Sequence, residues 1–339
     1  MKMKLVALLA FLFIVIHSGF AQTGPGGIQQ TNGLSDLVLW LDANTIDQSN
    51  GTNVSSWNDL SGYSNTATAP GNDPAFTTDV INGFPAVRFD EDNDEYLRID
   101  DDTSLKPNTI SVFVVGSYTN NTSQYSPFLI KTDNYDDWSR GYGIARQNNN
   151  EEVLGFVTDW NSNFVSSDLD RDTPTIMSLV YDKNDVRTYY DESSQGSDNY
   201  TTNINHTTNF LYLGISPDGS SGLGTGVRNP LDGDIYEAII LDRNVTAAER
   251  IIIHNYLAAK YGLTLGANNV YNEDENGDFD FDVAGIGIES DGSQTDSQGT
   301  GWVRINSASG MTSNGEYLMW GHDDAVLSTN SDISDALGN

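Results

Sequence analysis

Short runs of β-branched and aromatic residues alternate with polar clusters rich in Asn, Asp, Gly and Ser along most of the chain. Runs such as LVLWLDA at 37–43, TISVFVVGSY at 109–118 and DIYEAIILD at 234–242 are typical of strands, and the clusters between them are typical of turns. About eleven such runs predict an all-β fold, either a two-sheet sandwich or a barrel.

One segment has helical periodicity instead. Thr246 and Glu249 are spaced as a capping box, and Gly262 follows the last periodic residue as a C-cap. Between them, apolar residues recur on one face: Ile252, Ile253, Tyr256 and Leu257. The pattern predicts a single amphipathic helix that packs this face against the β-rich part and caps it.

The N-terminus has the features of a secretory signal. Two lysines precede an apolar run from Leu5 to Ile16, and small residues follow at Gly19 and Ala21. A transmembrane span needs roughly 20 apolar residues, which this run does not reach. We therefore expect cleavage after Ala21 and a secreted, extracellular or cell-surface protein without membrane insertion.

Composition narrows the class of partner. The chain has 48 acidic and 16 basic residues, a formal charge of −32, and this excess repels nucleic acid. It contains no cysteine, so disulfides cannot stabilise it outside the cell. Stability must come from a large core or from bound ions.

Four separated motifs carry a resemblance to a known family. They are LVLWLDANTI, VSSWNDLSGYSNTATAP, NGFPAVRFDEDNDEYLRID and GDIYEAIILDRNVTAAERIIIHNYLAAKYGLTL. In this order they resemble the concanavalin A-like lectin/glucanase superfamily, in the laminin-G-like version common in secreted proteins of Bacteroidetes. The resemblance implies a two-sheet antiparallel jelly roll. It leaves function open, because this fold hosts lectins, glycosidases, adhesion modules and spacers.

After residue 270 an acidic stretch leads to further strand candidates, VAGIGIESDGSQ and GEYLMWGHDD, which resemble a small uncharacterised domain that follows such modules. Because the chain ends in a polar tail, we expect this domain to be truncated. The predicted division is a signal peptide at 1–21, a leader at 22–34, a jelly roll at 35–266, an acidic linker at 267–281 and a small β-rich domain at 282–339.

Catalytic carboxylates are hard to find. A retaining glycosidase needs two carboxyl groups about 5 to 5.5 Å apart. Glucanases of the resembling fold carry them as Glu-x-Asp-x-x-Glu, but the Glu-x-Asp here, Glu289 to Asp291, lacks the third carboxylate and runs into a turn signal. Glu237 stands alone in its strand, grouped by alternation with Ile235 and Ile239. We interpret it as a polar anchor, paired to a backbone amide or to an arginine such as Arg88.

Calcium is the one cofactor that the sequence suggests. In DENGDFDFD, oxygen-bearing side chains alternate around a glycine, as in the first half of a calcium loop, and the candidate ligands are Asp274, Asn276, Asp278 and Asp280. Gly285 occupies the position of the closing glutamate. An acidic, solvated linker is therefore the favoured interpretation, with calcium binding as the alternative.

Loop aromatics are candidates for carbohydrate binding, because flat rings stack on sugar faces. The candidates are Tyr135, Trp138, Tyr142 and Trp160. Coverage of a sheet edge is the alternative role for them, and we assign Trp40 and Trp57 to the core. The sequence thus predicts a non-catalytic binding module for a polysaccharide, a glycoconjugate or a surface protein. The alternatives are a glycoside hydrolase and a structural spacer.

Overall fold

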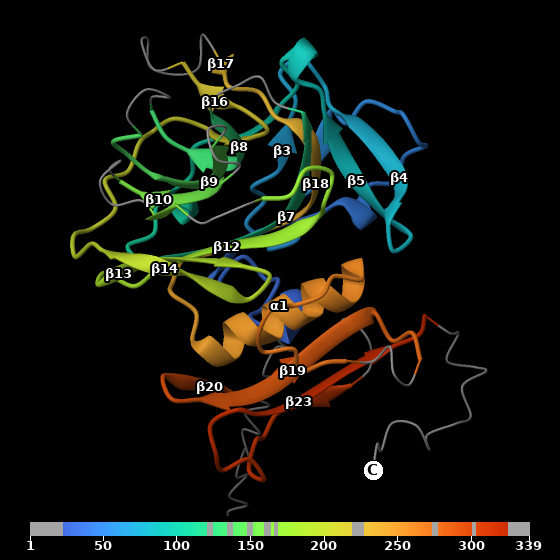
Figure 1. Ribbon diagram of the computed structural model, residues 1–339, viewed down its shortest axis with the longest axis vertical. Coiled ribbons are helices and arrows are strands. Elements are labelled where there is room, and N and C mark those ends of the chain that lie inside the picture. Colours follow the sequence, from blue (N-terminus) through green and yellow to red (C-terminus); the bar gives the residue numbers. More distant parts are fainter. Residues whose placement is uncertain are drawn as a thin grey trace, which may run out of the picture.

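The computed structural model describes residues 23–120, 125–133, 138–147, 152–158, 164–165, 169–218, 227–272, 277–299 and 303–324. Within these residues the fold is all-β, an antiparallel two-sheet sandwich with one α-helix and a further small sheet (Figure 1). This confirms the predicted fold class. Among the described residues, no helix is long and apolar enough to cross a membrane.

The first sheet of the sandwich carries the helix on its outer face. Its strands are ordered β14 (Ser193–Asn199), β13 (Asp185–Tyr190), β12 (Thr175–Tyr181), β7 (Ile110–Asn120), β18 (Asp232–Leu241), β5 (Phe84–Phe89) and β4 (Ala75–Ile81), and β1 (Leu37–Asp42) also pairs with β18. Runs such as Thr175–Tyr181 are buried on both faces. Continuous apolar runs, rather than alternating ones, are expected in strands that are covered on two sides.

The second sheet closes the sandwich. Its order is β11 (Phe164–Val165), β10 (Glu152–Val157), β9 (Tyr142–Gln147), β8 (Tyr125–Lys131), β15 (Leu211–Leu213), β6 (Leu97–Ile99), β3 (Ala67–Thr68) and β2 (Ser56–Trp57). Large side chains fill the space between the two sheets, among them Trp57, Phe89, Phe128 and Tyr142. Burying each contributes on the order of 1.5–3 kcal/mol.

The described part of the chain also contains four 3-10 turns and two short ladders outside the main sheets. The turns are η1 (Pro25–Gly27), η2 (Ala43–Thr45), η3 (Glu91–Asn93) and η4 (Thr103–Leu105). The ladders pair β16 (Ser216–Pro217) with β17 (Val227–Arg228) and β21 (Ser297–Gln298) with β22 (Arg304–Ile305). Of these, η1 and η2 contribute to the site described below.

The helix α1 (Ala247–Tyr261) begins and ends as its local chemistry predicts. Thr246 and Glu249 form the capping box, and Gly262 adopts the left-handed conformation at φ 60°. The predicted apolar face is buried, and the burial extends beyond it to nearly the whole helix. One side packs on Phe113 and Ile239 of the sandwich, and the other packs on β19 (Phe281–Glu289).

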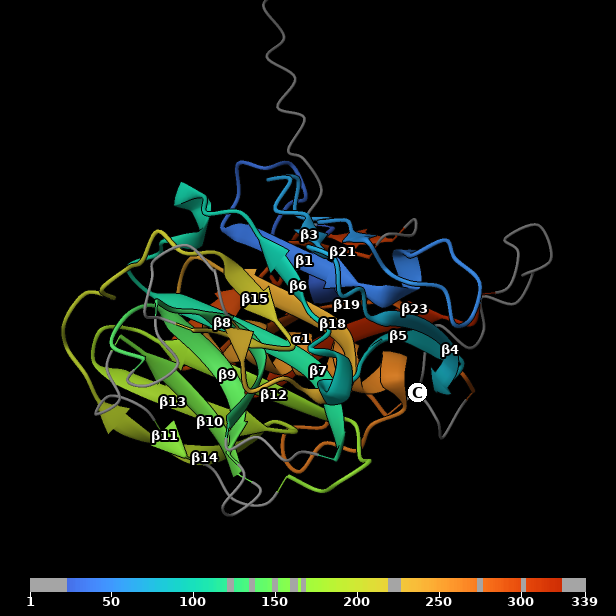
Figure 2. The same cartoon turned by 90° about the horizontal axis from the view of Figure 1, so that it is seen from above.

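Strand β19 is the centre of the small sheet, between β20 (Gly292–Gln294) and β23 (Glu316–His322). The helix is therefore a middle layer between two sheets (Figure 1). Seen from above, α1 and β19 lie beneath the strands of the sandwich (Figure 2).

Residues of the predicted leader also belong to this middle layer. Turn η1 is buried and contacts both α1 and β19. Gly26 lies against Ile252 of the helix, and Ser297 Oγ donates to the Gly26 carbonyl oxygen at 3.3 Å. The leader, the helix and the small sheet thus share one packed interface, while the predicted domain boundaries stay a prediction.

Candidate functional site

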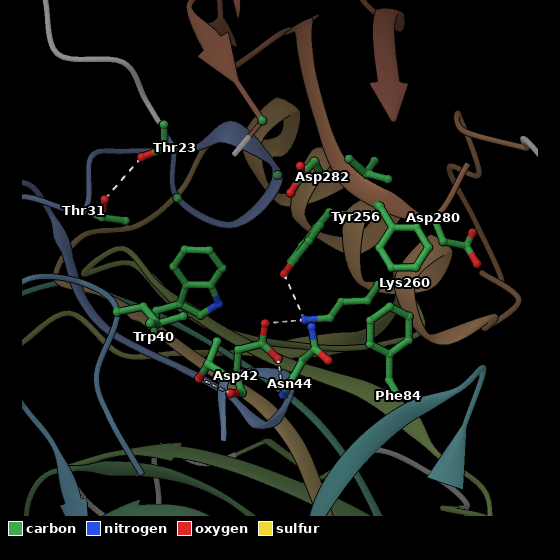
Figure 3. Close-up of a pocket in the computed structure, with 17 residues that line it drawn as sticks. Thr23, Thr31, Trp40, Asp42, Asn44, Phe84, Tyr256, Lys260, Asp280 and Asp282 are labelled. Atoms are coloured by element: carbon green, nitrogen blue, oxygen red, sulfur yellow. Dashed lines mark hydrogen bonds and ion pairs between the residues drawn. The ribbon is translucent and has the colours of Figure 1, made fainter. Parts of the chain in front are cut away.

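A cavity of about 390 Å³ opens where the sandwich, the helix and the small sheet meet (Figure 3). Its walls come from four parts of the chain: Thr23 and Thr31 near η1; Trp40, Asp42, Asn44 and Phe84 from the sandwich; Tyr256 and Lys260 from the helix; and Asp280, Phe281 and Asp282 from the small unit. Aromatic rings and polar side chains therefore face the same space.

A β-bulge in β18 lies behind the residues that line this cavity, since Glu237 in the bulge binds Trp40, Tyr256 and Lys260 of its walls. The pairing of β18 with β7 shifts in register between Ile235 and Glu237. Ile235 lies in the core between the two sheets, whereas Tyr236 and Glu237 both lie on the helix side, where each contacts Tyr261. The predicted grouping of Glu237 with Ile235 on one face was wrong, because a bulge inserts an extra residue and breaks the alternation.

Glu237 is fully satisfied by four donors in the protein. Its Oε1 accepts from Trp40 Nε1 at 2.7 Å and from Tyr256 OH at 2.9 Å. Its Oε2 accepts from Lys260 Nζ at 2.7 Å and from Tyr261 OH at 3.0 Å. A buried carboxylate needs such partners. The suggested partner Arg88 was wrong, since it binds Asp234 instead.

Lys260 joins this carboxylate to a second one. Its Nζ donates to Asp42 Oδ2 at 2.7 Å, and the backbone N–H of Asn44 donates to Asp42 Oδ1 at 2.9 Å. Burial raises the pKa of Glu237, although Lys260 opposes the shift. Burial lowers the pKa of Lys260, but the attraction of Asp42 and Glu237 is stronger, so its pKa is raised overall. One ammonium is thus shared by two carboxyl groups.

The opposite wall carries two further carboxylates. Asp280 accepts from Asn82 Nδ2 at 2.5 Å, and Asp282 Oδ2 lies 2.8 Å from His322 Nε2. Asp282 has a positive φ of 53° at a register shift in β19. A bulge with a left-handed, non-glycine residue is strained, and bulges of this kind re-aim side chains beside functional sites.

A second buried polar cluster lies farther along the helix. His254 Nε2 is 2.9 Å from Ser178 Oγ, and His254 Nδ1 is 3.2 Å from Glu192 Oε2. Burial, with a contribution from Arg250, holds the pKa of His254 well below its usual range. The atom types match a hydrolase triad, but Ser178 is 0 % exposed and offers no accessible nucleophile. We assign this cluster to packing of the helix.

Two of the predicted sugar-binding aromatics, Trp138 and Tyr142, lie in the described part of the chain, and neither lines the cavity. Trp138 is fully buried and stacks on Phe156 at 4.7 Å between ring centroids. Tyr142 is fully buried, and its hydroxyl donates to the Leu105 carbonyl at 3.2 Å. Tyr135 and Trp160 lie outside the described residues. A role of these four in ligand binding stays a prediction.

The predicted calcium ligands are only partly described. Asp278 is exposed, whereas Asp280 is buried and lines the cavity. Asp274 and Asn276 lie outside the described residues. In the described part of the chain, no three His, Asp or Glu residues are grouped so that they could hold a metal ion. The calcium loop stays a prediction.

Sequence reasoning did not single out Asp42, Asn44 or Lys260, and it included Asp282 only as the last residue of the acidic stretch DENGDFDFD. The sequence contains one signal for Asp42 and one for Lys260. Trp40 and Asp42 are two residues apart on one strand, and Tyr256 and Lys260 are four apart on the helix, so each pair shares a face. Neither signal shows that the two faces meet.

Comparison with known proteins adds a family match for the last part of the chain. Residues 249–338, which include most of α1 and the small sheet, match the family described as domain of unknown function DUF8202. A search of curated protein sequences found no match. Membership of the concanavalin A-like superfamily stays a prediction.

Several solved structures are similar at low identity. One is domain 4 of AbnA, a GH43 extracellular arabinanase from Geobacillus stearothermophilus, in complex with arabinotriose. It is 14% identical with a TM-score of 0.45, and the match covers 62% of this chain and 94% of that chain. The binding domain of Paraclostridial Mosquitocidal Protein 1 has 12% identity and a TM-score of 0.47 over 67% and 53%. Trypanosoma rangeli sialidase has 13% identity and a TM-score of 0.37 over 67% and 34%.

Proposed function

We propose that this chain is a secreted or cell-surface, non-catalytic binding module that recognises a carbohydrate. The observation that carries the proposal is the cavity of about 390 Å³, in which aromatic walls and polar groups face one space. Its size falls within the range of small-molecule sites, which hold a few placed polar groups among apolar ones.

The chemistry of the walls suits a sugar unit. Trp40, Phe84 and Tyr256 line the cavity and provide apolar contact for the C–H face of a sugar ring. Asp280 and Asp282 supply acceptors for its hydroxyl groups. The acidic lining repels anionic ligands, so a neutral sugar fits better than a uronic or sialic acid.

The geometry favours binding over hydrolysis. A glycosidase needs one carboxyl group to protonate the leaving oxygen and a second as base or nucleophile. Both oxygens of Glu237 and both of Asp42 already accept hydrogen bonds from the protein. We therefore keep a glycoside hydrolase, and likewise a structural spacer, as outcomes of the test.

The test is binding of the purified chain to a panel of neutral plant and algal polysaccharides, with reducing-end release assayed in the same tubes. Binding without release is the expected result. Release would replace the module by a hydrolase, and no binding to any polysaccharide would favour a spacer or a protein-binding module. Parallel tubes with calcium and with chelator test the predicted calcium loop.

A further inference from the structure

Three groups with complementary chemistry meet beneath the cavity. Lys260 Nζ lies 2.7 Å from Asp42 Oδ2 and 2.7 Å from Glu237 Oε2. Asp42 is 7 % exposed, Lys260 5 % and Glu237 1 %. The ammonium also lies 5.1 to 5.6 Å from the ring centroids of Phe84, Tyr256 and Tyr261. An amine, an acyl carbon and a proton acceptor are thus held together in an aromatic surrounding.

We propose that Lys260 and Asp42 condense into an intramolecular amide, an isopeptide cross-link between the side chains, with Glu237 as the proton-transfer group. The cross-link would join the end of β1 to the last turn of α1, positions 218 residues apart in the chain. It is a covalent modification of the protein and does not depend on the ligand proposed above.

The step balances without any added reagent. Glu237 takes a proton from the Lys260 ammonium, and the nitrogen lone pair then attacks Cγ of Asp42 to form the C–N bond. The bond from Cγ to Oδ2 breaks, and Oδ2 leaves as water after receiving two protons, one held by Glu237 and one relayed from the nitrogen. One ammonium and one carboxylate become one secondary amide and one water, and Glu237 returns to its starting state.

The surroundings assist the attack and the proton acceptor, whereas the raised pKa of Lys260 opposes loss of its proton. The Asn44 N–H, 2.9 Å from Asp42 Oδ1, donates to the oxygen on which negative charge collects during the attack. Burial raises the pKa of Glu237, which makes it a stronger base than an ordinary carboxylate. Holding the amine and the acyl group in contact removes the entropic cost of their encounter.

The product replaces the buried ion pair of Lys260 and Asp42 by a neutral amide, which avoids the desolvation cost of those two charges. Glu237 keeps the hydrogen bonds donated by Trp40, Tyr256 and Tyr261. Asp42 and Lys260 both line the cavity, so the released water has a path out. Because the chain has no cysteine, such a cross-link would supply the covalent stabilisation that disulfides give to many exported proteins.

A second lysine–aspartate pair provides an internal control. Lys131 is fully buried and its Nζ lies 2.8 Å from Asp101 Oδ1. Its other acceptor is the carbonyl oxygen of Asn209 at 2.6 Å, which is not a base. Without a second carboxylate on the amine, this pair should remain an ion pair.

The experiment is mass spectrometry of the purified full chain, intact and after proteolysis. We expect the loss of one water, located in a branched peptide that joins Asp42 to Lys260, with the peptides of Lys131 and Asp101 unmodified. Separate, unmodified peptides carrying Asp42 and Lys260 in the wild-type protein would overturn the proposal.

Variants test the roles of the individual groups. Lys260→Arg keeps the charge and cannot form the amide, and Glu237→Gln removes the proton acceptor, so both should lack the branched peptide. A branched peptide in Glu237→Gln at the wild-type level would overturn the role of Glu237. If Glu237→Gln does not fold, Asp42→Asn decides: it should give the same branched peptide with release of ammonia, and its absence there would contradict the assigned acyl carbon.

Discussion

Trp40 and Glu237 are 197 residues apart in the chain, yet the indole N–H of Trp40 donates to Glu237 Oε1 at 2.7 Å. The bond joins β1 to the bulge of β18 directly beneath the helix. Together with Tyr256, Lys260 and Tyr261 it leaves no oxygen of Glu237 unsatisfied. The network of Glu237 behind the cavity wall is therefore preorganised, and the contribution of each hydrogen bond to stability can be tested separately.

The first prediction concerns the Tyr261 hydroxyl, which donates to Glu237 Oε2. Tyr261→Phe removes this charge-assisted bond without changing the ring, so the free energy of unfolding should fall by about 1.5–3 kcal/mol in urea denaturation. Tyr212→Phe is the matched control, because Tyr212 is equally buried and its hydroxyl has no hydrogen-bond partner within the described part of the chain. Equal losses in both variants would contradict the role of the Glu237 network.

The second prediction concerns acid stability and His254. Its pKa in the folded protein lies well below 6.5, whereas in the unfolded chain it is ordinary. Below about pH 6.5 the unfolded state therefore binds a proton that the folded state does not, and stability is lost as the pH falls. His254→Gln removes the contribution of His254 to this pH dependence.

Urea denaturation of both proteins from about pH 8 to pH 5.5 provides the measurement. Wild type should lose stability relative to His254→Gln as the pH decreases. The comparison of the two proteins cancels other groups, such as Asp242, whose raised pKa acts in the opposite direction. Parallel curves for wild type and variant would show that His254 is protonated normally in the folded state.

The third prediction concerns Asp191, where burial raises the pKa to about 6. Above that pH the folded state holds a carboxylate that the unfolded state ionises more easily, so the aspartate destabilises the fold, and the penalty disappears as the pH falls toward its unfolded value. Asp191→Asn should stabilise the protein by about 1–2 kcal/mol at neutral pH, since an amide oxygen can still accept from the Ile176 N–H.

Asn also tolerates the positive φ of 42° at this position better than Asp does, and this effect is independent of pH. Measurements at about pH 7.5 and pH 4.5 therefore separate the two contributions. A gain from Asp191→Asn that is the same at both pH values would rule out the titration of Asp191 as its source.

The fourth prediction tests whether the predicted leader is structural. Gly27 has φ 74°, and a Cβ there would lie 2.0 Å from Ser297 Oγ and 3.0 Å from the Ala284 Cβ. Gly27→Ala should therefore loosen the junction between η1 and the small sheet and expose the small sheet to limited proteolysis. Gly51→Ala is the control, because Gly51 has φ 77° with no atom within 4 Å, and it should cost only about 1 kcal/mol. Identical proteolysis of the two variants would mean that η1 does not hold the small sheet in place.

Local chemistry made the helix predictable. Thr246, Glu249 and Gly262 act within a few residues of their own positions, so the boundaries of α1 could be derived without any tertiary information. The strand-rich pattern likewise gave the all-β class. The second covered side of the helix was missed because the packing of β19 on α1 is a tertiary contact that neither segment reveals in its own sequence.

Much less of the candidate site could be predicted from the sequence. The β18 bulge changes which face Glu237 occupies, and alternation cannot reveal an inserted residue. The partner Lys260 was hidden because a lysine in the last turn of a helix is normally explained by the helix dipole. Only the fold shows that Asp42, Glu237 and Lys260 converge.

The most direct test of the central claim is a binding isotherm of a cavity-filling variant. Asn44 lines the cavity and is exposed, so Asn44→Trp should obstruct the cavity without disturbing the core. Asn203→Trp adds the same ring at an exposed position that does not line the cavity. With a neutral oligosaccharide that wild type binds, we predict that Asn44→Trp loses binding at least tenfold while Asn203→Trp matches wild type, a difference of about 1.4 kcal/mol. Unchanged binding by Asn44→Trp would contradict the assignment of the cavity as the sugar site.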